Sequence, residues 1–224
     1  MKAHTTFPLF LLLLSTSLYS SQNPTNNYNK NVLHSLACLV FGEQDVRQDI
    51  QNSFNETAQK CNLQPDEYPP IKYMKNKYSS LISFTWFGTW INELQWSALN
   101  DKQKEWYRYH EIAHNTLHHP EKNITNAIIT ALFAGSMVNS LRGTPLVSLI
   151  AAFSFSTFAT LAMARRYEKK ADIFAARQLC KENQQDVIRE HIADLSQQPN
   201  SFSVFFHYPQ TQIGYLKEII QEKQ

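Results

Sequence analysis

The sequence YRYHEIAHNTLHHP, residues 107–120, contains the motif on which the interpretation of the whole chain depends. Within it, HEIAH places histidines at positions 110 and 114 and a glutamate at 111. On a helix, residues four apart lie on one face, so His110 and His114 can present ring nitrogens to a single metal ion. Glu111 would then reach a water molecule on that ion and act as its base, because zinc lowers the pKa of bound water to about 7. The motif therefore predicts a zinc site with two histidine ligands and a glutamate base.

A helix is expected around this motif on independent grounds. Ser97 or Asn100 could cap its start, Asp101 lies in its first turn, and the helical pattern continues to His118. We interpret His118 and the adjacent His119 as bystanders, because a catalytic zinc site needs only three protein ligands. The alternative interpretation of the motif is a surface helix that carries two histidines and a glutamate without any metal.

The third ligand is expected in a second charged segment, RRYEKKADIFAARQL, residues 165–179. Glu168 and Asp172 are four apart, so on a helix both side chains would be directed at the same place. Glu168 is the candidate third zinc ligand, and Asp172 is the candidate acceptor for the far nitrogen of a ligand histidine. The alternative is that Glu168 and Asp172 lie on a solvent-exposed, charged face of the helix. The neighbouring alanines, isoleucine and phenylalanine argue against this alternative, since they indicate that the segment is partly buried.

Two uncharged, apolar runs separate these two segments. They cover residues 124–141 and 146–164, and the sequence Arg142-Gly-Thr-Pro145 between them predicts a compact turn. Each run is close to the shortest length that crosses a bilayer as a helix. The pattern predicts an apolar helical hairpin over 124–164. Its length favours insertion into a membrane, whereas its asparagines, serines and threonines favour packing on the rest of the chain.

The N-terminal region has the composition of an export signal. Residues 1–21 combine a basic start, an apolar run and small polar residues, which predicts a cleaved signal peptide or an uncleaved anchor. The asparagine-rich stretch 22–31 is predicted to be disordered, and 32–224 to form the zinc-binding domain. We therefore expect an exported protein, either membrane-associated or periplasmic or otherwise extracytoplasmic. The net charge of +2, from 21 basic and 19 acidic residues, gives no reason to expect nucleic acid as a partner.

The remaining patterns predict a mainly helical α+β fold with a small β-sheet. Apolar residues recur at helical spacing over 31–59, either as one amphipathic helix or as a pair broken near Gly42. The aromatic and β-branched stretch 71–96 predicts two or three short strands. The three cysteines fit no metal-binding spacing. Cys38 and Cys61 are the nearest candidates for a disulfide, and buried free thiols are the alternative.

Taken together, these elements resemble the HtpX and CAAX prenyl protease family, the gluzincin metallopeptidases of peptidase family forty-eight. That family includes the Oma-type enzymes of the inner mitochondrial membrane and periplasmic outer-membrane quality-control proteases. Its pattern is HExxH, a hydrophobic helical hairpin, an R-x-x-E-x-x-A-D element, and a late His-Pro element before an amphipathic helix. The counterparts here are HEIAH, the apolar hairpin, RRYEKKADIFAARQL and FFHYPQTQIGYLKEI, residues 205–219. The resemblance covers roughly residue 85 to the C-terminus.

The resemblance implies a zincin fold with one zinc ion per chain. It gives the same site residues as above: His110, His114 and Glu168 as ligands, Glu111 as the base and Asp172 behind a ligand histidine. His207 takes the place of a late histidine that lies near the site in this family and stabilises the oxyanion. Here Tyr208 separates that histidine from Pro209, and Gln212 stands where the family has an arginine. A structural histidine is therefore the alternative interpretation of His207.

The activity that the resemblance implies is hydrolysis of peptide bonds in proteins, in the quality control of envelope or membrane proteins. Its partners would be protein or peptide substrates and a membrane. One alternative is a binding or chaperone-like protein that keeps the fold without activity, and another is a zinc hydrolase of a different substrate class. The immunity-repressor-cleaving peptidases also resemble the chain through HEIAHNTLHH and ADIFAARQL. Their third ligand, however, normally follows the histidines much sooner than Glu168 does.

Overall fold

The computed structural model describes residues 44–63, 71–74, 82–85, 88–140, 144–197 and 209–222. Within these ranges the chain is mostly helical and has one small β-sheet, so the predicted mainly helical α+β fold is confirmed. The chain divides into two compact units, Met1–Val46 with Pro69–Glu93 and Arg47–Tyr68 with Leu94–Gln224. The predicted signal at 1–21, the tail at 22–31, the first part of the helix expected over 31–59, and His207 lie outside the described residues.

The first unit contains a three-stranded mixed sheet. Its strands are β1 (Ile71–Tyr73), β2 (Ile82–Thr85) and β3 (Gly88–Ile91), in the order β1-β3-β2. The central strand β3 runs parallel to β1 and antiparallel to β2, with Trp90 opposite Lys72 on one side and Ser83 on the other. Trp90 is fully buried. The strands predicted within 71–96 are therefore confirmed, except that the end of that stretch forms the short helix α4 (Glu93–Ala98).

In the second unit, helix α5 (Asp101–Thr116) carries the HEIAH motif and begins with a complete capping box. The Asn100 side chain accepts a hydrogen bond from the Gln103 backbone N–H at 2.9 Å, and the Gln103 side chain accepts one from the Asn100 N–H at 3.0 Å. These bonds satisfy backbone donors that the first turn would otherwise leave free. The Asn100 side chain also donates to Glu190 of helix α8 (Gln185–Gln197) at 2.6 Å. Of the two predicted caps, Asn100 is the one used.

Helix α5 ends two residues earlier than the sequence pattern predicts. Its last residue is Thr116, and His118 adopts a left-handed backbone conformation with φ of 53°. A residue in this conformation ends an α-helix, because it cannot continue the right-handed path. His118 therefore does not extend the face of His114, contrary to the expected helical spacing, and the next helix begins at once with His119.

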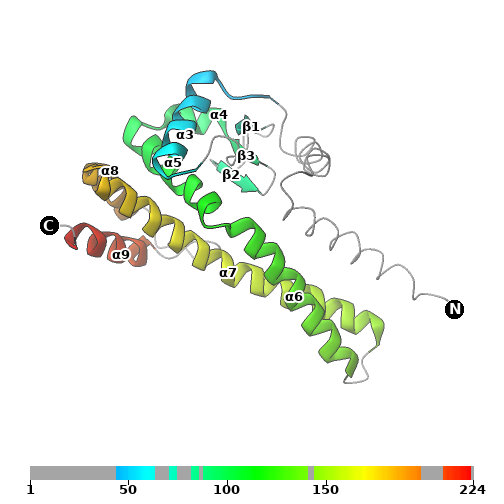
Figure 1. Cartoon of the computed structure of the whole chain (residues 1–224). Coiled ribbons are helices and arrows are strands. Elements are labelled where there is room, and N and C mark those ends of the chain that lie inside the picture. The colour runs from blue at the N-terminus through cyan, green and yellow to red at the C-terminus, as the bar shows by residue number, and fades with distance from the viewer. Residues whose placement is uncertain are drawn as a thin grey trace. The chain divides into compact units, whose positions relative to one another are not determined.

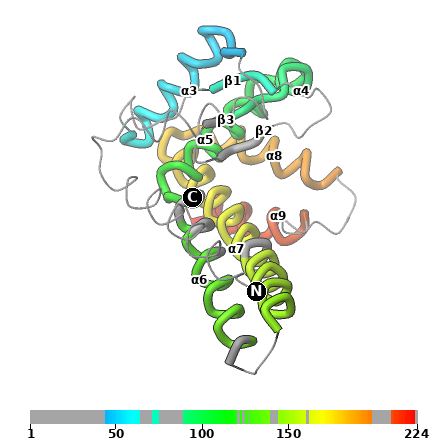
Figure 2. The backbone as a smooth tube through the Cα atoms, turned by 90° about the vertical axis from the view of Figure 1, so that its right-hand side faces the viewer, coloured from blue at the N-terminus to red at the C-terminus, as the bar shows by residue number. Residues whose placement is uncertain are grey.

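The predicted apolar hairpin is confirmed as two adjacent helices, α6 (His119–Ser140) and α7 (Pro145–Lys181). They lie side by side in both views (Figures 1 and 2), and a Cβ placed on Gly135 of α6 would lie 3.7 Å from that of Ala152 in α7. Thr144 caps α7 through the Val147 backbone N–H, and Pro145 occupies its first turn. Because α7 continues without a break for 37 residues, about 55 Å, one helix holds both the second apolar run and the Glu168–Asp172 pair.

Helix α7 is the central element of this unit and packs against α5, α8 and α9 (Pro209–Gln221). Small, fully buried residues lie on the two helices that carry the site, Ala113 on α5 and Ala171 and Ala175 on α7. Such side chains allow helix axes to approach closely, since little volume separates the backbones. Helix α3 (Gln48–Lys60) packs on α5, and Cys61 and Cys180 are both buried as thiols. Cys38, the other member of the candidate disulfide, lies outside the described ranges.

The capping box yields a prediction about stability. Asn100→Ala should lower the free energy of unfolding by about 1–2 kcal/mol, because the first turn of α5 loses its cap and Glu190 loses a donor. Asn100→Ser is the matched control, since serine restores the cap but is too short to reach Glu190. It should recover about half of the loss. Chemical denaturation would measure both variants, and an alanine variant as stable as the wild type would show that the cap contributes nothing.

Candidate metal centre

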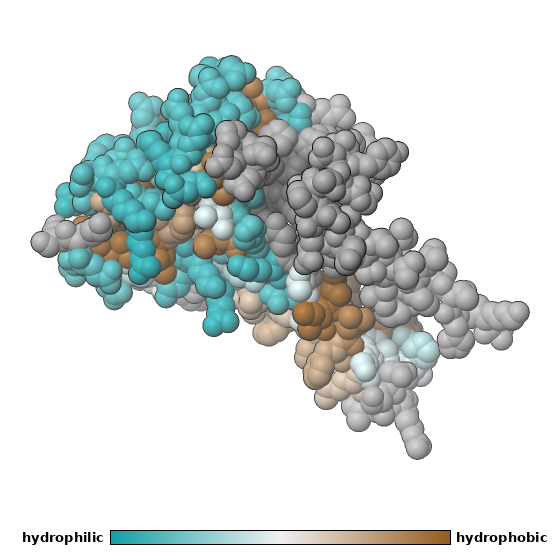
Figure 3. Space-filling view, viewed as in Figure 1, coloured by the Kyte–Doolittle hydropathy of each residue, from teal (hydrophilic) through white to brown (hydrophobic). Residues whose placement is uncertain are grey.

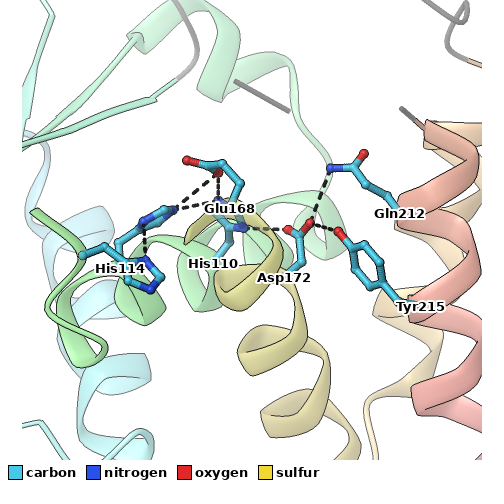
Figure 4. A network of polar contacts seen from close by, with 7 residues as sticks. His110, His114, Glu168, Asp172, Gln212 and Tyr215 are labelled. Atoms are coloured by element: carbon cyan, nitrogen blue, oxygen red, sulfur yellow. Dashed lines mark hydrogen bonds and ion pairs between the residues drawn. The ribbon is translucent and has the colours of Figure 1, made fainter. Parts of the chain in front are cut away.

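Three side chains from two helices converge on one point, as the sequence predicts. The Nε2 atoms of His110 and His114 are 3.2 Å apart, and Glu168 Oε2 lies 3.1 Å from the first and 3.5 Å from the second. Figure 4 shows the Glu168 carboxylate over both imidazole rings. Ligand atoms about 2.0–2.2 Å from a tetrahedral metal ion are separated by such distances. His110, His114 and Glu168 could therefore hold a metal ion.

The local fold explains this convergence. His110 and His114 are four apart on α5 and buried on its inward face, and Glu168 comes from the part of α7 that packs against that face. One free position would remain in a four-coordinate site, because the three residues supply three donor atoms. This number of protein ligands is typical of catalytic zinc sites, whereas structural zinc sites use four.

Asp172 lies one helical turn after Glu168 and contacts the ring nitrogen of His110 that is not directed at the other ligand atoms. Its Oδ1 is 2.9 Å from Nδ1 of His110, and its Oδ2 accepts hydrogen bonds from the Tyr215 hydroxyl and, at 3.4 Å, from Gln212 Nε2. Asp172 thus lies between His110 and two side chains of α9 (Figure 4). An aspartate in this position keeps the proton of His110 on Nδ1 and leaves Nε2 free for a metal. The sequence predicted the contact of Asp172 with a histidine and gave no role to Tyr215.

His119 is the second residue that the sequence interpretation missed. We expected a bystander, but the ring is 2% exposed and its Nδ1 lies 3.0 Å from Nδ1 of His114. It also stacks on Tyr167, with ring centroids 4.5 Å apart and ring planes 24° from parallel. Nothing in the sequence indicated this contact with His114, because the helical pattern extends α5 through position 118. The turn at His118 ends that helix and brings His119, as the first residue of α6, beside the ligand.

The charges of the site are strongly coupled. Burial disfavours a charged His110, but hydrogen bonds to Asp172 and Glu168 outweigh this effect and hold the pKa of the ring well above its usual value. Burial likewise disfavours ionisation of Glu168, yet hydrogen bonds with His110 and His114 keep the pKa of its carboxyl below the usual range. Without an ion, a proton on His110 therefore compensates the carboxylates. A bound cation would supply the same compensation, so the donor set fits a metal.

Glu111 follows the first ligand histidine and is 8% exposed. Burial raises the pKa of its carboxyl, while the nearby charges of His110 and His114 act in the opposite direction. A raised pKa brings a carboxylate closer to neutral pH, where a general base is most effective. His207, the remaining candidate site residue, belongs to the part of the chain that the structure does not describe.

Three comparisons with known proteins give no family assignment for the chain. No protein-family model matches the sequence, no curated protein matches it, and no solved structure matches the fold. The interpretation of the site consequently depends on the geometry and chemistry of the residues described above.

The contact between Tyr215 and Asp172 generates a prediction about metal affinity. Tyr215→Phe should weaken Zn²⁺ binding about 10-fold, because Asp172 loses a donor that holds it against His110. Competition with a chromophoric chelator would measure the affinity. Tyr109→Phe is the matched control, since it removes a buried hydroxyl that donates to Glu182 instead. Both variants should lose stability, but the control should bind Zn²⁺ like the wild type. Equal affinity of Tyr215→Phe and wild type would contradict the role given to Tyr215.

Proposed function

We propose that this protein is a zinc-dependent metalloendopeptidase with a gluzincin-type site, which hydrolyses peptide bonds in protein substrates. The observation that carries the proposal is the convergence of His110, His114 and Glu168 within 3.1–3.5 Å, next to the buried Glu111. Two imidazoles and one carboxylate form the ligand set of many zinc peptidases, and borderline-soft Zn²⁺ suits these donors. The zincin fold and a role in the quality control of envelope or membrane proteins are part of this proposal.

The residues around the site have distinct tasks in the proposed reaction. When bound, a zinc ion would polarise the scissile carbonyl and acidify a water molecule. Glu111 accepts the proton of the attacking water and delivers it to the amine that leaves. Asp172 keeps the proton of His110 on Nδ1 throughout, so that its Nε2 lone pair stays directed at the centre of the site. His207 is proposed to help stabilise the oxyanion, a role that depends on the resemblance of its sequence context alone.

Substitution of Glu111 separates catalysis from metal binding. Glu111→Gln should abolish cleavage of casein, a loss of at least about 1000-fold, because the amide keeps the shape of the side chain but cannot accept a proton. Its Zn²⁺ content should stay at one per chain, whereas His110→Ala should lose both metal and activity. Glu218→Gln, an exposed glutamate of α9, is the control and should behave like the wild type.

The outcomes of this experiment also distinguish the alternatives. Wild-type turnover by Glu111→Gln would refute the mechanism. A wild-type chain that binds Zn²⁺ but cleaves no protein would instead favour a binding or chaperone-like protein. Activity on a panel of non-peptide amides, without cleavage of casein, would favour a zinc hydrolase of another substrate class.

We also propose that the protein is exported and that the α6–α7 hairpin inserts into a lipid bilayer. Large apolar side chains point outward from both helices, and Figure 3 shows hydrophobic residues gathered over this part of the molecule. Those exposed by more than two fifths are Ile129, Leu132, Phe133 and Met137 on α6, and Leu146, Val147, Leu149, Ile150, Phe153, Phe155 and Phe158 on α7. A contiguous exposed surface of this kind is unfavourable in water and marks an interaction site.

The arrangement within the hairpin favours lipid as the occupant. Small residues lie between the helices, with Ala134 buried and Gly135 next to Ala152, whereas phenylalanines face outward. Membrane helices show this distribution, because small side chains let helices approach and lipid solvates the large ones. Among the described helices, α7 alone is long and apolar enough to cross a membrane, and 6% of its most apolar 18-residue stretch is buried. The uncharged run 146–164 is about 28 Å long, close to the thickness of the hydrocarbon core.

Flotation with phosphatidylcholine vesicles tests the hairpin. The full-length wild type should float with the vesicles and resist alkaline carbonate extraction. The double substitution Phe153→Arg and Phe158→Arg should reduce the floating fraction several-fold, because each buried arginine costs about 2.5–3.5 kcal/mol or more in a bilayer. Ser196→Arg with Gln197→Arg on α8 adds the same charge away from the hairpin and should float normally. A doubly substituted hairpin that floats like the wild type would refute hairpin insertion.

A further inference from the structure

His119 is a buried imidazole in contact with a proposed metal ligand, and the mechanism above assigns it no task. Its Nδ1 lies 3.0 Å from Nδ1 of His114, and the two rings meet edge to face. The inference below depends on the metal site proposed above.

The position of each proton follows from these contacts. A hydrogen bond between two Nδ1 atoms requires one ring to carry a proton there and the other to present a lone pair. His114 directs Nε2 at the other ligand atoms, 3.2 Å from His110 Nε2 and 3.5 Å from Glu168 Oε2. To ligate a metal through Nε2, a neutral His114 must carry its proton on Nδ1. The Nδ1–H of His114 is then the donor, and His119 is the acceptor.

We propose that His119 is a positioning residue: its Nδ1 lone pair accepts the Nδ1–H of His114 and thereby keeps Nε2 of His114 free to bind the metal. The two ligand histidines thus have different partners, since Asp172 accepts from His110 and an imidazole accepts from His114. A neutral acceptor suits this side of the site. A carboxylate at position 119 would add another negative charge to a buried region that already contains Glu111, Glu168 and Asp172.

The neighbours of His119 explain how its ring is held. It stacks on Tyr167, whose hydroxyl accepts a hydrogen bond of 2.9 Å from Asn126 of α6. Tyr167 directly precedes the ligand Glu168 on α7. The Nε2 of His119 is buried and has no hydrogen-bond partner among the residues that the structure describes. An unpaired buried N–H destabilises the fold. Its presence at Nε2 therefore indicates that the ring of His119 is positioned by the contact of its Nδ1 with His114.

Two substitutions separate the hydrogen bond from the stacking. His119→Phe keeps an aromatic ring of similar shape against Tyr167 but has no acceptor. His119→Asn loses the ring yet can place its amide oxygen where Nδ1 was. The affinity of the full-length protein for Zn²⁺, purified in detergent and measured by competition with a chromophoric chelator, is the readout. Thermal unfolding of the metal-free variants reports any loss of folding.

If the lone pair is what matters, His119→Phe should bind Zn²⁺ 10- to 100-fold more weakly, while His119→Asn should stay within about 3-fold of the wild type. The metal-free phenylalanine variant should unfold within a few degrees of the wild type. Wild-type affinity of His119→Phe, or an equal loss in both variants, would overturn the proposal, as would a wild-type chain that binds no Zn²⁺. A chain that shows the expected affinities but no proteolysis would refute the proposed peptidase activity and leave the role of His119 intact.

Discussion

The close contact of α5 with α7 is the constraint on which the rest of the structure depends. His110 and His114 on one helix meet Glu168 and Asp172 on the other only if the two backbones come near each other, and fully buried alanines on both helices allow this approach. The same contact buries His110, His114 and Asp172 and partly buries Glu168. Two of them have further partners on neighbouring helices: Asp172 accepts a hydrogen bond from Tyr215 on α9, and His114 contacts His119 on α6. The hydrogen bonds among these polar side chains are therefore a consequence of the apolar packing of α5 on α7.

Helical spacing explains how much of this could be predicted from the sequence. An interval of four residues puts two side chains on one face, so the pairs His110–His114 and Glu168–Asp172 were predicted together with their helices. The cap at Asn100 was predicted because capping residues have a recognisable local chemistry. His119 was missed because the end of α5 is set by the left-handed backbone of His118, for which the sequence has no strong signal. A glycine there would have marked the turn.

Tyr215 was missed for a different reason. Its role depends on how α9 packs on α7, and nothing local in the sequence encodes which face of an amphipathic helix meets an aspartate 43 residues upstream. The interval of three between Gln212 and Tyr215 was the available signal, since it places both side chains on one face. The sequence pattern drew attention to the missing arginine at position 212, whereas the structure shows that glutamine and tyrosine share the contact with Asp172.

The unbroken course of α7 has a mechanical consequence. Phe158, on the apolar half, and Glu168 belong to one rigid rod and are about 15 Å apart along its axis. Helices in a bilayer tilt to match its thickness, and a tilt of about 10° would displace a point at that distance by about 3 Å. That displacement is comparable to the 3.1 Å between Glu168 and His110, so it is large enough to separate the carboxylate from the histidines. With the hairpin in lipid, the thickness of the surrounding membrane would affect whether His110, His114 and Glu168 can bind the same ion.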